Sequence, residues 1–103
     1  MPRDSFTAFV LEQLTGAGAV FCKPMFDSFG FYLDGKFFAI AHKGSLFFKT
    51  SKKTRQAYEE YGSKPFAPGK GQVLKNYYEV PPDILEDSVA LREWARLAAE
   101  AGE

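Results

Sequence analysis

The 103-residue sequence has one cysteine, one histidine and one tryptophan, and its 13 basic and 13 acidic residues cancel. The single cysteine, Cys22, excludes an intrachain disulfide and favours a reducing, cytoplasmic setting. No apolar run approaches the roughly 18 residues of a membrane span. A signal peptide is not expected, because Asp4 and Glu12 bracket the first apolar stretch. The balanced charge argues against a uniformly basic nucleic-acid binder.

Phenylalanine is what the chain has in excess, with 11 residues, and 46% of the sequence is hydrophobic. A chain of this length buries about two-thirds of its surface on folding, enough for one modest core without disulfides or metal. The sequence contains no repeat, low-complexity tract or linker. We therefore expect a single domain over 1–103.

Helical periodicity predicts three helices. The first covers 4–15, and a short polar helix covers 52–61. The last runs from Pro82, a residue suited to a first helical turn, to about Ala99. The stretch Ser63–Gly71 holds two prolines and two glycines and is predicted to be a loop.

Strands are predicted over 20–26, over 72–80 and in a three-stranded meander within 29–49. Pro24 predicts that the first strand lies at a sheet edge or carries a bulge, because proline has no N–H to donate to the hydrogen bonds between strands. The resulting order is α-β-β-β-β-α-β-α. It indicates an α+β fold of two layers, an antiparallel sheet with the helices mostly on one face.

Two turns set the register of the meander. Asp34-Gly35 predicts a two-residue type I′ turn, and His42-Lys43-Gly44 predicts a three-residue loop with a G1 bulge. The predicted pairs are Leu33–Lys36, Phe31–Phe38, Phe29–Ile40, Ala41–Ser45, Ile40–Leu46 and Phe38–Phe48. Because side chains alternate along a strand, one face is predicted to carry Phe29, Phe31, Leu33, Phe38, Ile40, Leu46 and Phe48, and the other Tyr32, Phe37, Ala39, Ala41, Phe47 and Lys49.

The second of these faces forms an apolar patch that needs a cover. If the helices lie on the first face, the patch is exposed, and exposed patches of this kind mark interfaces. Tyr32, Phe37 and Phe47 are therefore the predicted protein-interface residues, with a homodimer or another protein as the partner. The alternative is that a helix or the C-terminal strand covers them.

The zero net charge conceals a segregated chain. Residues 42–75 hold eight basic and two acidic residues, a net charge of +6, whereas 76–103 have a net charge of −5. The basic middle predicts an alternative function in nucleic-acid binding, with phosphate contacts from Lys49, Lys52, Lys53 and Arg55 and stacking from Tyr77 and Tyr78. The competing interpretation is a solvated surface whose charge pairs with the acidic C-terminal helix.

Nucleophilic catalysis would need Cys22 or a serine beside His42 and a carboxylate. Asp34 is the nearest carboxylate in sequence to His42, yet the two lie at opposite ends of one strand, about 20 Å apart. We therefore interpret them as a turn aspartate and an exposed turn histidine, and Cys22 as a small buried hydrophobe. Ligands for a metal ion are also too few, so no metal is predicted.

Two further motifs invite a chemical interpretation. Gly69-Lys70-Gly71 lacks the rest of a phosphate-binding loop and is predicted to be flexible surface. A small enzyme using a pocket beside Lys23 and Tyr78 is the least favoured hypothesis. We expect no enzymatic activity, no catalytic residues and no cofactor.

An ordered set of short motifs covers about residues 5–99. The motifs are Lys23-Pro24-Met25-Phe26, Gly30-Phe31-Tyr32, Asp34-Gly35-Lys36-Phe37-Phe38-Ala39, Leu46-Phe47-Phe48-Lys49, Gly62 with Pro65-Phe66, Tyr77-Tyr78-Glu79-Val80-Pro81 and Trp94-Ala95. This set resembles the N-terminal domain of the TfoX/Sxy family. The chain departs from it at Asp27-Ser28, where the family often has glycine.

The resemblance implies a regulatory role. Family members are linked to the control of natural competence genes in bacteria, together with a cyclic-AMP-responsive transcription factor, and they typically carry a second, C-terminal domain. The present chain is expected to be a stand-alone N-terminal domain. The function implied is a non-enzymatic regulatory or adaptor domain that acts through protein contacts, and the resemblance assigns no catalytic residue.

Overall fold

The computed structural model describes residues 5–25, 28–69 and 72–101. In these ranges it contains a six-stranded antiparallel sheet and four helices, which confirms the predicted α+β fold. The elements in chain order are α1 (Ser5–Gln13), β1 (Val20–Met25), β2 (Ser28–Leu33), β3 (Lys36–His42), β4 (Ser45–Lys49), α2 (Lys52–Glu60), β5 (Pro65–Gly69), β6 (Gln72–Glu79), α3 (Pro82–Leu85) and α4 (Ser88–Glu100).

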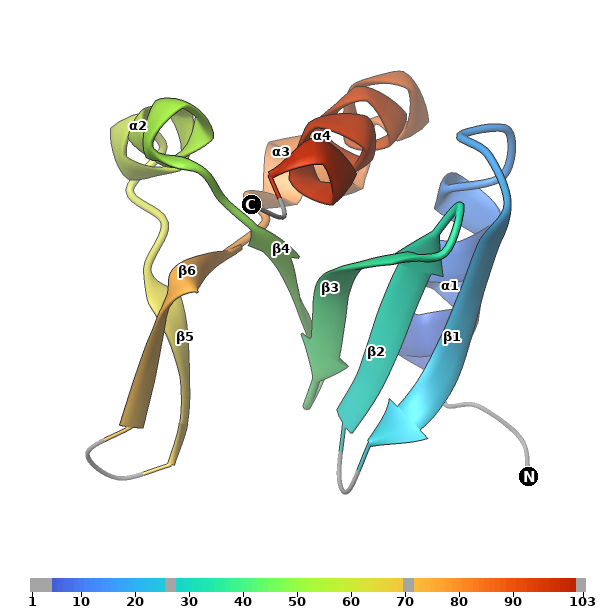
Figure 1. Ribbon diagram of the computed structural model, residues 1–103, viewed down its shortest axis with the longest axis horizontal. Helices are drawn as coiled ribbons and strands as arrows, with labels where there is room; N and C mark the ends of the chain where they lie inside the picture. Colours follow the sequence, from blue (N-terminus) through green and yellow to red (C-terminus); the bar gives the residue numbers. More distant parts are fainter. Residues whose placement is uncertain (1–4, 26–27, 70–71, 102–103) are drawn as a thin grey trace.

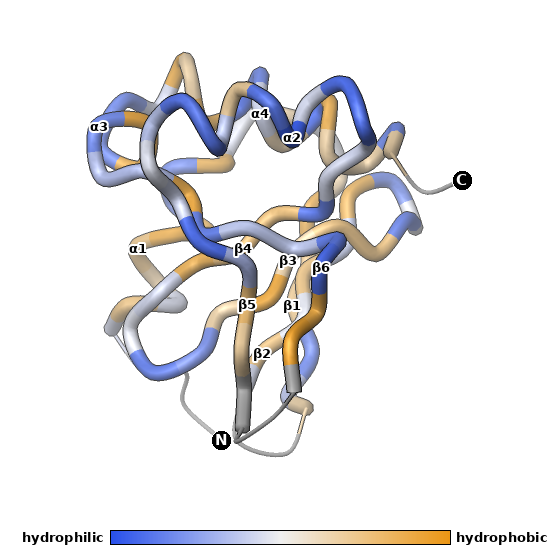
Figure 2. The backbone as a smooth tube through the Cα atoms, turned by 90° about the vertical axis from the view of Figure 1, so that its left-hand side faces the viewer, coloured by the Kyte–Doolittle hydropathy of each residue, from blue (hydrophilic) through white to orange (hydrophobic). Residues whose placement is uncertain are grey.

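The strands are ordered β1-β2-β3-β4-β6-β5, so β1 and β5 form the two edges. The edge position of β1 confirms the prediction from Pro24. Figure 1 shows α1 behind β1 and β2, with α2, α3 and α4 above the strands. Turned by a quarter, Figure 2 again shows α1 to one side of the strands and the other helices above them.

Local sequence explains where the helices begin. Ser51 caps α2 in a reciprocal capping box with Thr54, and Pro82 lies at the start of α3 as predicted. The predicted final helix is divided, since Asp87 caps a separate helix, α4, by accepting a hydrogen bond from the Ala90 N–H. Within the described ranges, none of these helices combines the length and the apolar character needed to cross a membrane.

The prediction of a loop over 63–71 is wrong for Pro65–Gly69, because these residues form strand β5. This strand pairs with β6 alone, and an edge strand tolerates proline because one of its sides makes no ladder bonds. The pairing is irregular: Pro65 faces Tyr78, whereas the next residue, Phe66, faces Leu74. Proline and glycine therefore marked an irregular edge strand rather than a loop.

The first turn of the meander is as predicted, but the register beyond it differs. Asp34 and Gly35 both have positive φ, 51° and 84°, as a type I′ turn requires, and Leu33 faces Lys36. A register shift then follows between Phe31 and Tyr32, so Phe31 faces Ala39 rather than Phe38. Phe29 accordingly faces Ala41 rather than Ile40.

The second turn also differs from the prediction. Lys43 and Gly44 have φ of 51° and 80° and form a two-residue turn, so His42 faces Ser45 and Ala41 faces Leu46. The predicted three-residue loop, and the pairs Ala41–Ser45, Ile40–Leu46 and Phe38–Phe48 that depend on it, are wrong. Two-residue turns with positive φ match strand twist, which explains the preference.

These shifts exchange residues between the two sides of the sheet. Ile40 faces Phe47 on the side away from the core cluster, whereas Ala39 and Ala41 join that cluster with Phe48 and Leu46. The other residues predicted for the core face are confirmed there, with Phe31, Phe38 and Phe48 fully buried. Helical side chains close this core, including Val10, Leu14, Leu91, Ala95 and Ala98.

Candidate functional site

The side of the sheet that faces away from the helical core carries a group of aromatic side chains. In Figure 1, the face of β1–β3 turned to the viewer carries none of the described helices. We call this side the open face and define it by Phe21, Lys23, Tyr32, Phe37, Phe47 and Tyr77, which the strand register places together. Phe21, at the β1 edge, is 45% exposed.

Four of these rings form one row across the sheet. Phe21 stacks on Tyr32 with a centroid distance of 5.0 Å and an interplanar angle of 6°. Tyr32 meets Phe37 edge-on at 5.3 Å, and Phe37 lies 6.1 Å from Tyr77. The Nζ atom of Lys23 lies 5.6 Å from the Tyr32 centroid, within cation–π range. The row therefore presents a continuous aromatic surface with a cation beside its second ring.

Gly30 makes room for the centre of this row. A Cβ atom on Gly30 would lie 2.6 Å from Cε1 of Phe37 and would also overlap the sulfur of Met25. The Phe37 ring therefore lies directly on the Gly30 backbone, an approach that only glycine permits. A glycine inside a strand is the sequence signal for such close contact.

Phe47 belongs to a second cluster on the same face. Its ring lies 4.4 Å from Phe66 of β5, which in turn lies 5.4 Å from the ring of His42. Phe66 is only 4% exposed. The three predicted interface residues are therefore separated: Tyr32 and Phe37 share the row, and β5 partly covers Phe47. Ala39 and Ala41, predicted for this face, lie in the core.

His42 is the last residue of β3, and its prediction as an exposed turn residue is wrong. It is half-buried, and its Nδ1 atom lies 2.6 Å from the Ser28 hydroxyl. Asp34 lies at the other end of β3, where its carboxylate accepts a hydrogen bond from the Ala19 N–H at 3.0 Å. Cys22 faces Phe31 and packs against the core. The fold does not bring these three groups into a catalytic arrangement.

The basic residues predicted for nucleic-acid contact are brought together. Lys49 ends β4, and Lys52 and Lys53 occupy the first turn of α2, where both are exposed. Nη2 of Arg55 donates to the Asn76 side-chain oxygen at 3.3 Å, while its Nε is buried without a hydrogen-bond partner. A shallow cavity of about 270 Å³ is lined by Lys49, Lys52, Arg55 and Asn76.

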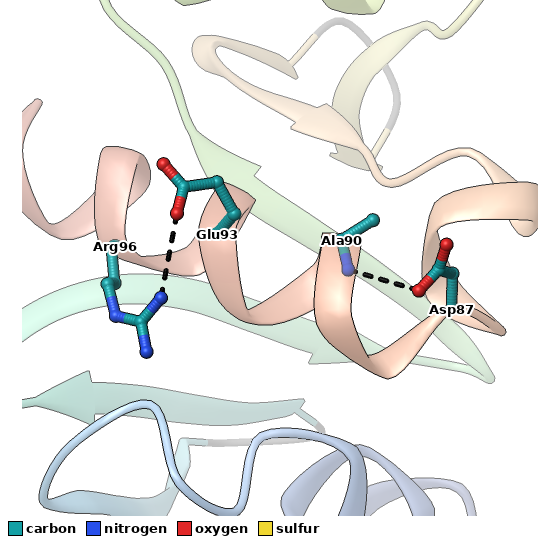
Figure 3. A network of polar contacts seen from close by, with 4 residues as sticks. All are labelled: Asp87, Ala90, Glu93 and Arg96. Atoms are coloured by element: carbon teal, nitrogen blue, oxygen red, sulfur yellow. Dashed lines mark hydrogen bonds and ion pairs between the residues drawn. The ribbon is translucent and has the colours of Figure 1, made fainter.

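The expected pairing of this basic segment with the acidic C-terminal helix is not observed in the described ranges. Within these ranges one salt bridge is present. It joins Arg96 to Glu93 at 3.5 Å, and both residues lie in α4 (Figure 3). In the same view Asp87 serves as the helix cap. In the part of the chain that the structure describes, no salt bridge joins α2 to α4.

Lys23 and Tyr78, suggested together as a pocket, lie on opposite sides of the sheet. Tyr78 turns toward the helices, where its hydroxyl donates to the Glu59 carboxylate at 3.1 Å. Burial, and then this contact with Glu59, raises the pKa of Tyr78 above its usual range. Lys23 lies on β1 and Tyr78 on β6. These two strands are four strand spacings apart in the sheet, a distance of about 19 Å. The fold does not form the suggested site.

The Gly69-Lys70-Gly71 motif falls mostly outside the described residues.

A hollow that the sequence did not predict lies between α2 and α4. It has a volume of about 340 Å³ and is lined chiefly by Ala57, Tyr58, Trp94 and Leu97, with Lys49 and Lys53 among its polar neighbours. We call it the α2–α4 hollow. Finding it requires the relative placement of two helices that are far apart in sequence, which local patterns do not supply.

Comparison with known proteins agrees with the fold and the motifs. The family model of the TfoX N-terminal domain matches residues 12–102, nearly the whole chain. A search of curated proteins finds no match. The matched range extends from within α1 to beyond the end of α4, so it includes all six strands and both clusters of the open face. The chain therefore belongs to the TfoX N-terminal domain family.

Proposed function

We propose that this chain is a non-enzymatic regulatory or adaptor domain that acts through protein contacts made by the open face. The observation that carries the proposal is the aromatic row, which holds four rings on a sheet side that none of the described helices covers. Half-exposed aromatic side chains supply large contact area at small conformational cost. Membership of the TfoX family supports a role in the control of competence genes.

The geometry of the row favours a protein over a nucleic acid at this face. A base stacks on a ring that presents its flat side to solvent. Phe21 and Tyr32 instead turn one flat side toward each other, and Tyr32 meets Phe37 edge-on. Each of these two rings therefore has at most one flat side open for stacking, and apolar side chains can also pack against the ring edges.

The sheet edges favour contact through the face as well. Pro24 lies in the edge strand β1, and Pro65 lies in the opposite edge strand β5. Proline at an edge removes a ladder donor and discourages the addition of another strand. Association through the open face is the route left by these edges.

A second copy of the chain is the partner that the charges favour. Lys23 and Glu79 are both exposed and end one cross-strand row of the open face, in which Lys23 faces Gly30, Gly30 faces Ile40, Ile40 faces Phe47 and Phe47 faces Glu79. A two-fold axis parallel to the strands would place Lys23 of each copy against Glu79 of the other. Such self-complementarity is what an isologous dimer requires.

Sedimentation velocity tests this proposal directly. The wild type should form a dimer whose fraction grows with protein concentration. Phe21→Glu, at a position 45% exposed on the open face, should give a monomer, whereas Phe9→Glu, at a position 38% exposed on α1, should leave the dimer unchanged. A wild type that stays monomeric, or equal effects of both variants, would contradict the proposal.

A charge exchange adds a second test of the orientation. Lys23→Glu alone should weaken the dimer, and adding Glu79→Lys should restore it, because the opposite charges meet again in the exchanged pair. A regulatory role predicts in addition that Phe21→Glu, but not Phe9→Glu, fails to restore transcript levels in a host that lacks the chain.

Nucleic-acid binding by the basic segment is the second candidate. The observation that favours it is the cavity that groups Lys49, Lys52 and Arg55 beside the exposed Lys53. Phosphate contacts would make affinity fall steeply with salt concentration. Fluorescence anisotropy with labelled DNA at low salt should then show binding that the double variant Lys52→Glu, Lys53→Glu abolishes; binding that the variant leaves unchanged would exclude this candidate.

A further inference from the structure

The α2–α4 hollow lies between helices α2 and α4 and shares none of the residues that define the open face. Lys49, one of its lining residues, faces Tyr77 of the open face in the strand register. Its volume of about 340 Å³ is at the lower end of the range for small-molecule sites, about 300–1,000 Å³. It is lined by residues from the end of β4, from α2 and from α4. Three separate elements therefore converge on one concave surface, which is how ligand sites in small domains are formed.

The walls of the hollow are apolar and aromatic. Tyr58 is 3% exposed and meets Trp94 edge-on, with their ring centroids 4.7 Å apart. Tyr61 supports Trp94 from another side at 5.8 Å. These contacts fix the Trp94 ring, while Leu97 remains 41% exposed at the hollow although it is a large apolar side chain. A ligand that covers Leu97 would gain hydrophobic free energy.

The polar lining residues of the hollow are Lys49, Lys53, Thr54 and Tyr58, and the two lysines are the charged ones. Lys53 is exposed, Lys49 is half-buried, and the described lining residues include no acidic side chain. Lys49 also lines the neighbouring cavity with Lys52 and Arg55, so the positive charge extends beyond the hollow. An apolar pocket with two lysines among its lining residues is complementary to a molecule with an apolar chain and one negative charge.

We propose that the α2–α4 hollow binds an amphipathic carboxylate of the fatty-acid class, whose alkyl chain packs on Trp94 and Leu97 while its carboxylate pairs with Lys49 and Lys53. A neutral lipid would leave the lysines without a counter-charge, and a small inorganic anion would leave the apolar wall exposed. The volume suits a short or medium alkyl chain rather than a long one.

Trp94 provides the readout, because it is the only tryptophan in the sequence. Titration of the purified chain with octanoate should change the intensity and wavelength of the tryptophan fluorescence in a saturable way. Hexanoate should bind more weakly, by about fourfold for each methylene removed. Octanol and octylamine test the charge: both should bind more weakly than octanoate, octanol by up to about fivefold for each ion pair lost.

Variants separate the two parts of the site. Lys49→Gln combined with Lys53→Gln should lower octanoate affinity and leave octanol affinity unchanged, whereas Lys64→Gln, at an exposed lysine outside the hollow, should change neither. Leu97→Ser, at a largely exposed position, should weaken both ligands without endangering the fold. Ala57→Phe should fill the hollow and abolish binding.

Three results would overturn the proposal. The first is a Trp94 fluorescence spectrum that does not change when octanoate is added. The second is equal affinity for octanoate and octanol, which would show that the lysines do not recognise charge. The third is a fluorescence change caused by raising the protein concentration alone, which would show that a second copy of the chain fills the hollow.

Discussion

The two sides of the same sheet bury phenylalanine in different ways. On the helical side, Phe31, Phe38 and Phe48 are fully buried, and aliphatic side chains from α1 and α4 close over them. On the open face, Phe21, Tyr32 and Phe37 contact chiefly one another and the sheet backbone. One side is a closed core, whereas the rings on the other side are held in place mainly by one another.

Pre-ordering has a physical consequence. Side chains that already hold one another in place lose little conformational freedom on binding, so more of the contact energy contributes to affinity. The row Phe21–Tyr32–Phe37–Tyr77 meets this condition, and Gly30 fixes its centre. If the two sides divide their roles, substitutions on the helical side should lower stability, and substitutions on the open face should weaken association.

The largest expected effect is on the core side. Phe38→Ala should lower the free energy of unfolding by about 3–5 kcal/mol, because it leaves a cavity among fully buried neighbours. Phe21→Ala should lower it by less than about 1 kcal/mol, because that ring is already half in solvent. Urea denaturation at low protein concentration measures both. Similar losses for the two variants would show that the open face belongs to the core.

Gly30→Val should have the next largest effect. The new side chain would collide with Phe37 and Met25, and such overpacking costs about 1–3 kcal/mol. The variant should also fail to form the proposed dimer, because the centre of the aromatic row is displaced. Denaturation and sedimentation velocity check the two effects separately. A Gly30→Val chain that keeps both properties would show that the row tolerates rearrangement.

The buried tyrosines predict loss of stability in alkali. Burial raises the pKa of Tyr58 above its ordinary value of 10.0, so the unfolded chain ionises first as the pH rises. The stabilisation is complete below pH 10 and is lost above it, by about 1.4 kcal/mol per pH unit for each such tyrosine. Urea midpoints at pH 8 and 11 should show a smaller decline for Tyr58→Phe than for the wild type. Equal declines would contradict this assignment.

The smallest effect concerns the basic first turn of α2. Lys53 lies at the positive end of the helix dipole, an arrangement that lowers helix stability. Lys53→Glu should therefore raise the free energy of unfolding by about 0.3–1 kcal/mol. Lys64→Glu, outside the helix, is the matched control and should leave it nearly unchanged. A free energy of unfolding that does not rise in Lys53→Glu would show that Lys53 does not destabilise α2.

Much of the fold follows from local sequence. Asp34-Gly35 supplies the two positive φ angles of its turn, Ser51 supplies a cap, and Pro24 marks an edge. These features depend on one or two neighbouring residues, which a sequence states directly. The fold class and strands β1, β2 and β6, predicted within 20–26, 29–49 and 72–80, could be recognised on this basis.

The errors arise where the outcome depends on packing. Alternation along β3 was counted as regular, but the register shift beside Phe31 moved Ile40 to the open face and Ala39 to the core. The same alternation correctly assigned Tyr32 and Phe37 to the open face. Neither the cover that Phe66 provides for Phe47 nor the hollow beside Trp94 has a local signature, because both require elements distant in sequence.

The most direct test of the central claim, that the open face is the association surface, is a nuclear magnetic resonance dilution series on the isotope-labelled chain. Raising the protein concentration should shift amide resonances of β1, β2 and β6 around Phe21, Tyr32 and Tyr77, and should leave α1 unchanged. Concentration-dependent shifts confined to the helices, near Phe9 or Val89, would contradict the claim, as would spectra that do not change with concentration.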